Sequence, residues 1–320
     1  MIAIKDFVGT EIIKVASFKE LLKTCETIRS KDKKTLFTIE IENNYKEEGS
    51  FKFPYSGFYI KGHNHLLSSS LYAKMKDENN KELTTWKTAA LKITGSHNIF
   101  EELGVENTSG DPINKGQEVA LAIYGDDNLF LKVKLSSTQD TLFVGPLPDD
   151  LATRYLDFIP EDERYFEGNS LNCFVSSSIY GSVDFVFGAG KGIFYQCQLI
   201  SINDDRKEAY VVAPANSLKD DFGFLFYNCS FVNGGVLASS IYLARPWRDY
   251  ALAVFYSCTY GDHIKKEGFS DWSDVNRTRT ARFEEYPLQE GRVAWTKNKS
   301  GETLPERYFS AISLLKKSLN

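Results

Sequence analysis

The sequence lacks the signatures of several common enzyme and binding sites. It has no G-x-S-x-G motif and only four histidines, so a serine hydrolase built on a Ser-His-Asp triad is not indicated. The five cysteines show no C-x-x-C spacing, which argues against a zinc or dithiol site. No run of about 18 apolar residues occurs, so no membrane-spanning helix is expected. No block of Lys and Arg occurs either, and the net charge of −5 does not favour a nucleic-acid partner.

The four histidines are expected to lie in solvated loops. His63 and His65 are close enough in sequence to share a metal ion, but no neighbouring residue completes such a site. His65 and His97 have no carboxylate paired with them in a local motif. We therefore expect neither a metal nor a cofactor.

The composition is typical of a β-rich globular protein. Of the 320 residues, 42% are hydrophobic and 25% are charged, and the chain contains 23 Phe and 17 Tyr, which favour strands. No linker is visible, so we expect a single domain over residues 1–320 and a monomer. The N-terminus has no recognisable signal segment and the cysteines are unpaired, which favours a cytoplasmic location; secretion is the alternative if the chain is a trimmed mature form.

Two segments are predicted to be helical. Residues 17–30 place Phe18, Leu21 and Cys25 at helical spacing, with Ser17 as N-cap and Glu20 as its capping-box partner. The C-terminal segment 302–320 is predicted to form a helix that packs through Tyr308, Ile312 and Leu315. The first helix is expected to cap the N-terminal end of the domain.

Between these segments, short apolar strands recur between polar turns from about residue 54 onward. Six of the strands carry a small or aliphatic residue in an equivalent place: Leu103, Val133, Cys173, Cys197, Cys229 and Cys258. Separations of 24 to 40 residues between them are in the range of solenoid repeats. The sequence therefore predicts stacked coils with parallel pairing, in which the cysteines form an interior ladder and no disulfides.

One acidic stretch interrupts the repeats. Residues 145–164 contain three Pro and six Asp or Glu, and few apolar residues. We expect a long surface loop there, containing one helical turn.

The stretch GSVDFVFG at 181–188 places one carboxylate, Asp184, among large apolar residues. Strand alternation predicts that Asp184 shares a face with Ser182 and Val186, while Val183, Phe185 and Phe187 share the other. Such a carboxylate costs free energy unless a cation or hydrogen-bond donors hold it. Other polar residues fall near predicted coil ends, and stacked coils would bring them together on one face: Gln117, Gln139, Asp140, Arg245 and Trp247.

These blocks resemble pectin methylesterases, the pectinesterase family of carbohydrate esterases (family 8). The resemblance lies in NTSGDPINKGQEVALAI, STQDTLF, GSVDFVFG and YLARPW, in the family's order, and in HIKKEGFSDW, RFEEY and GRVAW further on. It extends from about residue 14 to about 296 and implies a right-handed parallel β-helix. The expected activity is removal of methyl esters from galacturonate units of homogalacturonan or its oligosaccharides, giving methanol and pectate.

The resemblance also implies roles for individual residues. Asp184 matches the family's nucleophile, Asp140 its general acid/base, and Arg245 the arginine that pairs with the nucleophile. Gln117 and Gln139 match the amides that stabilise the oxyanion. Residues that match the sugar-binding groove are Trp247, Phe143, Val183 and Phe187.

The chain departs from the family pattern at a few positions. Ala244 stands where R-P-W is usually preceded by Gly, Phe143 where Tyr is usual, and Phe269 where Trp is usual. The stretch 145–164 lengthens the gap between Asp140 and Asp184, and we hypothesise that this acidic loop borders the cleft and disfavours long polyanions. Two other functions remain open at this stage: a β-helix hydrolase that cuts the glycosidic bond, and a non-catalytic carbohydrate-binding β-helix.

Overall fold

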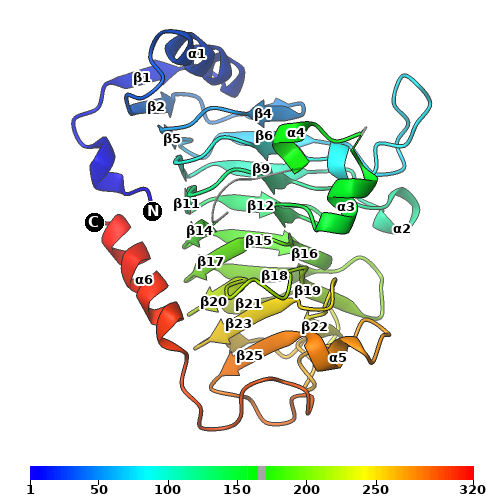
Figure 1. Ribbon diagram of the computed structural model, residues 1–320. Helices are drawn as coiled ribbons and strands as arrows, with labels where there is room; N and C mark the ends of the chain where they lie inside the picture. The colour runs from blue at the N-terminus through cyan, green and yellow to red at the C-terminus, as the bar shows by residue number, and fades with distance from the viewer. Residues whose placement is uncertain (157, 165–170) are drawn as a thin grey trace.

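The main chain coils through three parallel sheets that stack into one prism (Figure 1). The computed structural model describes residues 1–156, 158–164 and 171–320. The first sheet consists of β1 (Ile12–Val15), β2 (Phe37–Ile41), β5 (Phe58–Lys61), β8 (Ile99–Glu101), β11 (Leu129–Leu131), β14 (Leu171–Val175), β17 (Lys191–Tyr195), β20 (Phe224–Tyr227), β23 (Leu252–Tyr256) and β25 (Arg282–Tyr286).

The other two sheets follow the same order of coils. The second consists of β3 (Lys46–Glu48), β6 (Leu66–Ser69), β9 (Gly104–Asn107), β12 (Lys134–Ser136), β15 (Ser178–Gly181), β18 (Gln198–Ile202), β21 (Ser230–Gly234) and β24 (Thr259–Tyr260). The third consists of β4 (Phe51–Phe53), β7 (Leu91–Ile93), β10 (Leu121–Ile123), β13 (Leu142–Val144), β16 (Val183–Gly188), β19 (Ala209–Pro214) and β22 (Ile241–Ala244). The predicted right-handed parallel β-helix is confirmed, with the connection hand that parallel strands nearly always take.

A column of phenylalanines runs through the interior of the β-helix. Neighbouring strands of the first sheet pair in register, so the same position recurs on each coil. The rings stack nearly parallel, with centroids 4.6 to 5.4 Å apart, along Phe100, Phe130, Phe174, Phe194, Phe226 and Phe255. Like residues therefore pack on like residues, which is the packing that a stack of coils favours.

The predicted interior ladder exists, but one of its members was misassigned. The residues between the first and second sheets on successive coils are Leu103, Val133, Ser177, Cys197, Cys229 and Cys258. Cys173 instead lies within β14, where it pairs in register with Leu129 and Ile193 on the outer face of the first sheet. The local sequence around Cys173 resembles that around Cys197, but it is shifted by four residues relative to the coil. All five cysteines are free, as expected.

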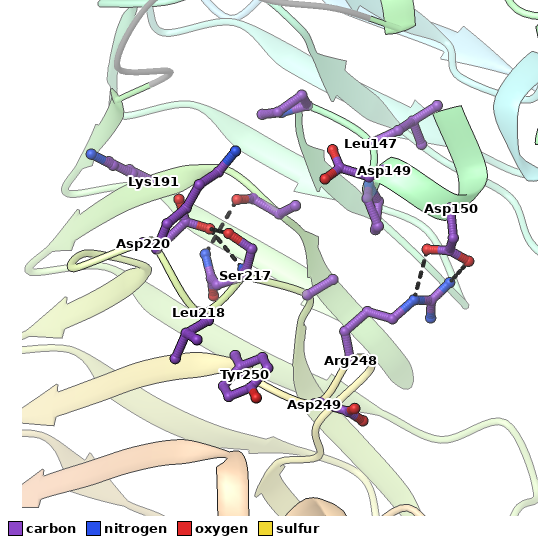
Figure 2. A pocket seen from close by; sticks show the side chains of 16 residues that line it. Leu147, Asp149, Asp150, Lys191, Ser217, Leu218, Asp220, Arg248, Asp249 and Tyr250 are labelled. Carbon is purple, nitrogen blue, oxygen red and sulfur yellow. Dashed lines mark hydrogen bonds and ion pairs between the residues drawn. The ribbon is translucent and has the colours of Figure 1, made fainter. Parts of the chain in front are cut away.

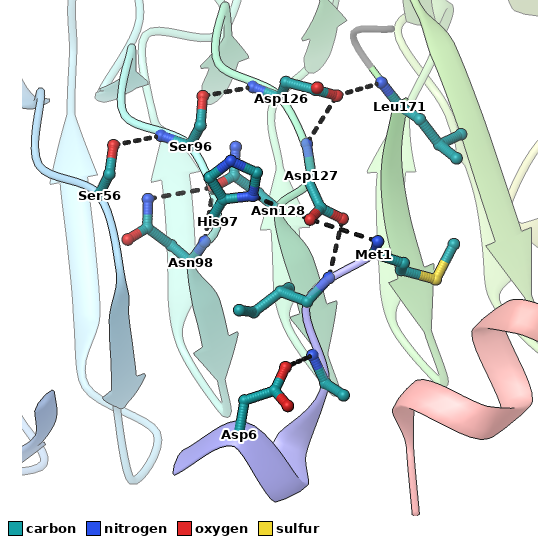
Figure 3. Close-up of polar contacts among 12 residues, drawn as sticks. Met1, Asp6, Ser56, Ser96, His97, Asn98, Asp126, Asp127, Asn128 and Leu171 are labelled. Carbon is teal, nitrogen blue, oxygen red and sulfur yellow. Dashed lines mark hydrogen bonds and ion pairs between the residues drawn. The ribbon is translucent and has the colours of Figure 1, made fainter. Parts of the chain in front are cut away.

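Polar ladders hold the turns between the third and first sheets (Figure 3). The buried amide of Asn98 donates to Asn128, and that of Asn128 donates to Asn172, each at 3.1 Å. These side chains therefore satisfy one another where the backbone leaves the sheet. The N-terminal amine lies 3.5 Å from an Asp127 carboxylate oxygen, which ties the start of the chain to the same turns.

Helices cover the end and one side of the β-helix. The predicted first helix is α1 (Phe18–Lys31), and the Ser17 side chain accepts a hydrogen bond from the Glu20 amide at 3.1 Å. The Glu20 carboxylate returns to the amide of Ala16 rather than Ser17, so the capping box is displaced by one residue. The predicted C-terminal helix is α6 (Glu306–Ser318), which lies along the outer face of the first sheet. Its buried residues include Tyr308, Ile312 and Leu315, as expected.

The expectation of solvated histidines was wrong for two of the four. His65 is fully buried and its Nε2 lies 3.1 Å from a Glu47 carboxylate oxygen. His263 is also fully buried. His97 is exposed, but it pairs with Asp127 at 2.9 Å. These carboxylates come from other coils, so no local motif in the sequence could reveal them.

One of the remaining helices precedes β1, another lies between β24 and β25, and the other four lie in loops that enter or leave the third sheet. Two of these four lie in the predicted surface loop. The short helices are η1 (Ile4–Phe7), η2 (Thr85–Lys87), α2 (Pro112–Lys115), α3 (Asp149–Arg154), α4 (Glu161–Arg164) and α5 (Arg277–Thr280). The loop 145–164 contains two helices rather than one helical turn, and its residue 157 lies outside the described residues. Glu163 is buried between Lys92 and Lys52, at 2.7 and 3.1 Å. Within the described part of the chain, no helix is both long and apolar enough to cross a membrane.

Replacement of Phe174 by Ala should test the phenylalanine column. The fully buried ring contacts stacked rings on both sides, so its loss should lower the free energy of unfolding by about 3–5 kcal/mol. Urea unfolding followed by circular dichroism measures this change. Leu314→Ala, at a position 56% exposed on α6, is the control and should change it by less than about 0.5 kcal/mol. Equal effects of the two substitutions would contradict the assigned packing.

Candidate active site

A cavity of about 200 Å³ opens on the outer face of the third sheet and collects most of the residues singled out from the sequence. Residues within or next to six strands of the third sheet contribute to it. The lining residues are Thr85, Trp86, Gln117, Gln139, Asp140, Asp184, Phe187, Ala213, Arg245, Trp247 and Trp272. Thr85 and Trp272 are more than 160 positions apart in the sequence, and they share this site because their coils stack.

Asp184 reaches this cavity because strand β16 is irregular at that point. Its φ is +50°, and the pairing with β19 shifts register between Val183 and Val186. Val183, Phe185 and Val186 all lie in the interior core, while Asp184 and Phe187 face the cavity. The predicted alternation was therefore wrong, since the bulge turns Asp184 to the same side as Phe187.

Asp140 has the same unusual backbone conformation. Its φ is +64°, and its amide donates to the carbonyl of Val183 on the next coil at 3.0 Å. Left-handed backbone is uncommon for residues other than glycine, although Asp and Asn tolerate it best. The stacked coils hold both aspartates in this conformation, as they hold other turn residues of the β-helix, among them Gln196 and Asn228.

Arg245 neutralises Asp184 with a bidentate ion pair. Its Nε donates to one carboxylate oxygen at 2.8 Å and its Nη2 to the other at 2.6 Å. The guanidinium lies between two aromatic rings, with its central carbon 3.8 Å from the Tyr210 ring centroid and 3.6 Å from that of Trp272. Planar stacking and a two-point ion pair fix the orientation of both charged groups.

The two carboxyl groups differ in their proton affinity. Burial raises the pKa of Asp140 well above its ordinary value, and the neighbouring Asp184 carboxylate raises it further. Burial also raises the pKa of Asp184, but the charge and hydrogen bonds of Arg245 oppose that rise. A proton shared by this pair therefore resides on Asp140, and Asp184 is the carboxylate.

Two glutamine amides complete the polar side of the cavity. Gln117 and Gln139 both line it beside Asp140. The side-chain carbonyl of Gln139 accepts a hydrogen bond from Arg206 at 2.8 Å, which leaves its NH₂ group as the donor toward Asp140 and the cavity. Arg206 is in turn held by Asp204, whose carboxylate accepts a hydrogen bond from Ser182 at 2.6 Å.

The predicted groove residues divide between the cavity and the layers beneath it. Trp247 and Phe187 line the cavity. Phe143 is buried below Trp86 and packs against Phe187, with ring centroids 5.2 Å apart. Val183 is not among the lining residues, because the bulge at Asp184 directs its side chain into the core.

At two of the positions that differ from the family pattern, the side chain is buried in the core. The methyl group of Ala244 is fully buried in the core. Phe269 is also buried there and packs against Phe283, with ring centroids 5.2 Å apart. Neither change reaches the cavity.

Several residues of the site were not identified from the sequence. Trp272 ends the quoted block HIKKEGFSDW, so it could have been found, but its contact with Arg245 depends on the turn before α5. Tyr210 and Arg206 have no motif around them, and only the stacking of coils brings them to Arg245 and Gln139. Trp86 lies in η2, far before the first motif residue of the site.

The arrangement supports acyl transfer. An ionised, oriented carboxylate can attack a carbonyl carbon, two amides can donate to the oxygen, and a protonated carboxyl can supply a proton to the leaving group. Among the described residues, no three His, Cys, Asp or Glu side chains are grouped so as to hold a metal ion.

Asp140→Asn should stabilise the folded protein at neutral pH. The raised pKa means that the folded chain keeps a proton which the unfolded chain releases above the ordinary carboxyl pKa of about 3.9. Wild-type stability therefore falls as pH rises from that value toward the folded pKa, whereas the variant has no such loss. The midpoint of thermal unfolding, measured against pH, should be higher for the variant at neutral pH and equal below about pH 3.9.

Asp150→Asn provides the control of opposite sign. Hydrogen bonds from Arg248 lower the pKa of Asp150, so this variant should be the less stable one at neutral pH and should match wild type in acid. An Asp140→Asn variant no more stable than wild type at neutral pH would contradict the assignment of the proton.

Comparison with known sequences bears on the family. The family model described as Pectinesterase matches residues 15–147 and 162–311. Pectinesterase QRT1 from Arabidopsis thaliana is 32% identical over 225 residues, which are 68% of this chain and 52% of that protein. Probable pectinesterase 8 from the same plant is 29% identical over 214 residues, 63% of this chain and 47% of that protein. The chain thus spans about half the length of these curated relatives.

Solved structures of pectin methylesterases share the fold. The enzyme from carrot superposes with a TM-score of 0.70 at 18% identity, covering 97% of this chain and 96% of that chain. PemA from Erwinia chrysanthemi gives 0.69 at 20% identity, covering 98% and 97%. Likeness at these identities establishes the fold alone. The family model, however, matches most of the described β-helix on both sides of the insertion, and the chain belongs to the pectinesterase family.

Proposed function

We propose that this protein is a pectin methylesterase, an aspartyl esterase that removes methyl esters from galacturonate units and releases methanol and pectate. The observation that carries the proposal is the bidentate pair of Asp184 with Arg245, in one cavity with Asp140 and two glutamine amides. Membership of the pectinesterase family supports the same activity. The binding of hexasaccharides in related pectin methylesterase crystals supports an oligosaccharide or polysaccharide ligand.

The first half of the reaction forms an acyl-enzyme. The Asp184 carboxylate attacks the ester carbonyl, and the amides of Gln117 and Gln139 donate to the oxygen that becomes negative. Each such donor is commonly worth about 3 kcal/mol in the transition state. The C–O bond to the methoxy group then breaks, Asp140 gives its proton to the departing oxygen, and methanol leaves an anhydride between substrate and Asp184.

The second half regenerates the enzyme with water. Asp140, now ionised, takes a proton from a water molecule that attacks the anhydride. Cleavage of the anhydride returns the Asp184 carboxylate and frees the galacturonate carboxyl. Arg245 stabilises Asp184 as the leaving group in this step, so one cation serves both the nucleophile and the leaving group.

Two other functions predict different products. A β-helix hydrolase would use the two carboxyl groups on a glycosidic bond and create new reducing ends. A non-catalytic sugar-binding module would bind the chain and release nothing. The bidentate neutralisation of Asp184 and the amide donors around it favour attack on a carbonyl over either alternative.

Methanol release and reducing ends should be measured together on highly methylated pectin and on methylated oligogalacturonides. Wild type should release methanol without new reducing ends. Asp184→Asn should lose the activity by at least roughly 10³-fold, because an amide cannot form the acyl-enzyme. Glu290→Gln, at an exposed loop position, is the matched control and should behave as wild type. New reducing ends, or no Asp184-dependent methanol from any of these substrates, would overturn the proposal.

The pH dependence of kcat/KM should report the two carboxyl groups. Activity should rise with pH as Asp184 ionises and fall as Asp140 loses its proton. Burial raises the pKa of Asp184 and Arg245 opposes that rise, so Arg245→Gln should move the rising limb to higher pH as well as reduce the rate. A rising limb at the same pH in wild type and variant would show that Arg245 does not set the ionisation of the nucleophile.

A further inference from the structure

Two tryptophans meet across the outer face of the third sheet and bound the catalytic cavity. Trp86 comes from η2, before β7, and Trp247 follows β22, five strands away in the sheet. Their ring centroids are 6.4 Å apart, with an angle of 26° between the planes. Beneath them, Trp86 packs on Phe143 and Trp247 on Phe187, at 5.4 and 5.9 Å.

The inserted segment 145–164 supports this aromatic contact from behind. Leu147, Leu151 and Ile159 are buried in the same apolar cluster as Trp86, and Tyr155 lies 6.3 Å from its ring. The family model leaves residues 148–161 of this chain unmatched, so the support is an addition of this chain to the common β-helix.

Ion pairs hold both ends of the insertion to the β-helix. Asp150 on α3 accepts two hydrogen bonds from Arg248, at 3.0 and 2.8 Å, and Arg248 is the neighbour of Trp247 (Figure 2). On α4, the buried Glu163 lies between Lys92 and Lys52. The insertion therefore spans the sheet from the loop after β22 to strands β7 and β4. We name this structure, Trp86 and Trp247 with Leu147, Leu151 and Tyr155, the aromatic wall.

A second cavity lies on the other side of the aromatic wall. It measures about 540 Å³ and is drawn in Figure 2. Its residues Ala189 and Ala215 follow the catalytic-cavity residues Phe187 and Ala213 by two positions, so the two cavities succeed each other along the strand direction. Among the residues that the structure describes, none lines both cavities.

A sugar chain cannot pass through the wall as it stands. A ring held between two aromatic faces needs a carbon contact of roughly 3.5–4.0 Å on each side, hence roughly 7–8 Å between the two faces. The tryptophan centroids are closer than that. The catalytic cavity is also smaller than the roughly 300–1,000 Å³ usual for sites that enclose drug-sized ligands.

Three of the six acidic residues of the insertion are paired with basic side chains. Asp150 is paired with Arg248, and Asp162 and Glu163 are paired with Lys52. Repulsion of a polyanion by this loop is therefore weaker than its acidic composition suggests.

We propose that the aromatic wall ends the substrate cleft beside the catalytic carboxylates, so that the enzyme acts on the terminal methylated galacturonate of a chain and on short oligosaccharides. The proposal rests on the proposed esterase function. The chain enters from the side of Gln117 and Gln139, and its end abuts Trp86 and Trp247. Trp86 is the residue that determines this specificity, because the insertion fixes it against Trp247.

The dependence of rate on chain length tests the proposal without any variant. Methylated galacturonans fractionated by length should be compared at equal ester concentration, with methanol release as the readout. Action at chain ends predicts an initial rate that falls in inverse proportion to chain length. Equal rates per ester at every length would overturn the proposal while leaving the esterase function intact, whereas absence of Asp184-dependent methanol at every length would overturn the esterase function itself.

Trp86→Ala should then open the wall. The variant should raise kcat/KM for long chains relative to a methylated trisaccharide by at least roughly tenfold. Leu218→Ala, an exposed position in the second cavity, is the control and should leave this ratio unchanged. Because Trp86 is buried, circular dichroism must show that the variant is folded. A double variant, Leu151→Ala with Tyr155→Ala, removes only the side chains that support Trp86. It should shift the ratio in the same direction. Folded variants with an unchanged ratio would overturn the role of the wall.

Discussion

Parallel hydrogen bonding between coils is the constraint on which this structure depends. Each coil advances by one inter-strand spacing of roughly 4.8 Å, so positions that repeat once per coil form straight columns. In the interior this produces the phenylalanine column and the Leu-Val-Ser-Cys ladder. On the outer face of the third sheet it brings Gln117, Asp140 and Asp184 from three successive coils into one small cavity.

The site departs from this regular pattern at its two aspartates. Asp140 and Asp184 both take positive φ, and the strand that carries Asp184 is bulged. The bulge turns a carboxylate outward from an otherwise apolar strand, while its neighbours stay in the core. Arg245 then holds that carboxylate ionised, while burial and the neighbouring charge of Asp184 leave the proton on Asp140. The regular coils bring the side chains close together, and the irregular backbone at Asp140 and Asp184 turns their carboxyl groups toward the cavity.

Much of the fold could be predicted from the sequence, because repeats and amphipathic helices are local patterns. The coils and both terminal helices are confirmed, and most of the residues singled out for the site line one cavity. The errors share one cause: the register in which one coil pairs with the next cannot be read from the local sequence of either coil. Cys173 was placed in the ladder by a local likeness, although the ladder residue of its coil is Ser177. Strict alternation assigned Asp184 to the wrong face because the bulge depends on pairing with β19.

Contacts between residues far apart in the sequence could not be predicted either. His65 and His97 pair with carboxylates from other coils, and Trp86 meets Trp247 across five strands of the third sheet. The insertion could be located from its composition, but its function as a support for Trp86 follows only from packing. The acidic composition of the insertion suggested repulsion of a polyanion, whereas the folded chain pairs three of its six acidic residues with Arg248 and Lys52.

The division of roles between the two carboxyl groups is the central claim, and infrared difference spectroscopy at neutral pH tests it most directly. The difference between wild type and Asp140→Asn should contain the carbonyl stretch of one protonated carboxylic acid. The difference between wild type and Asp184→Asn should contain the bands of an ionised carboxylate. A proton found on Asp184, or two ionised carboxylates in the wild-type cavity, would contradict the account.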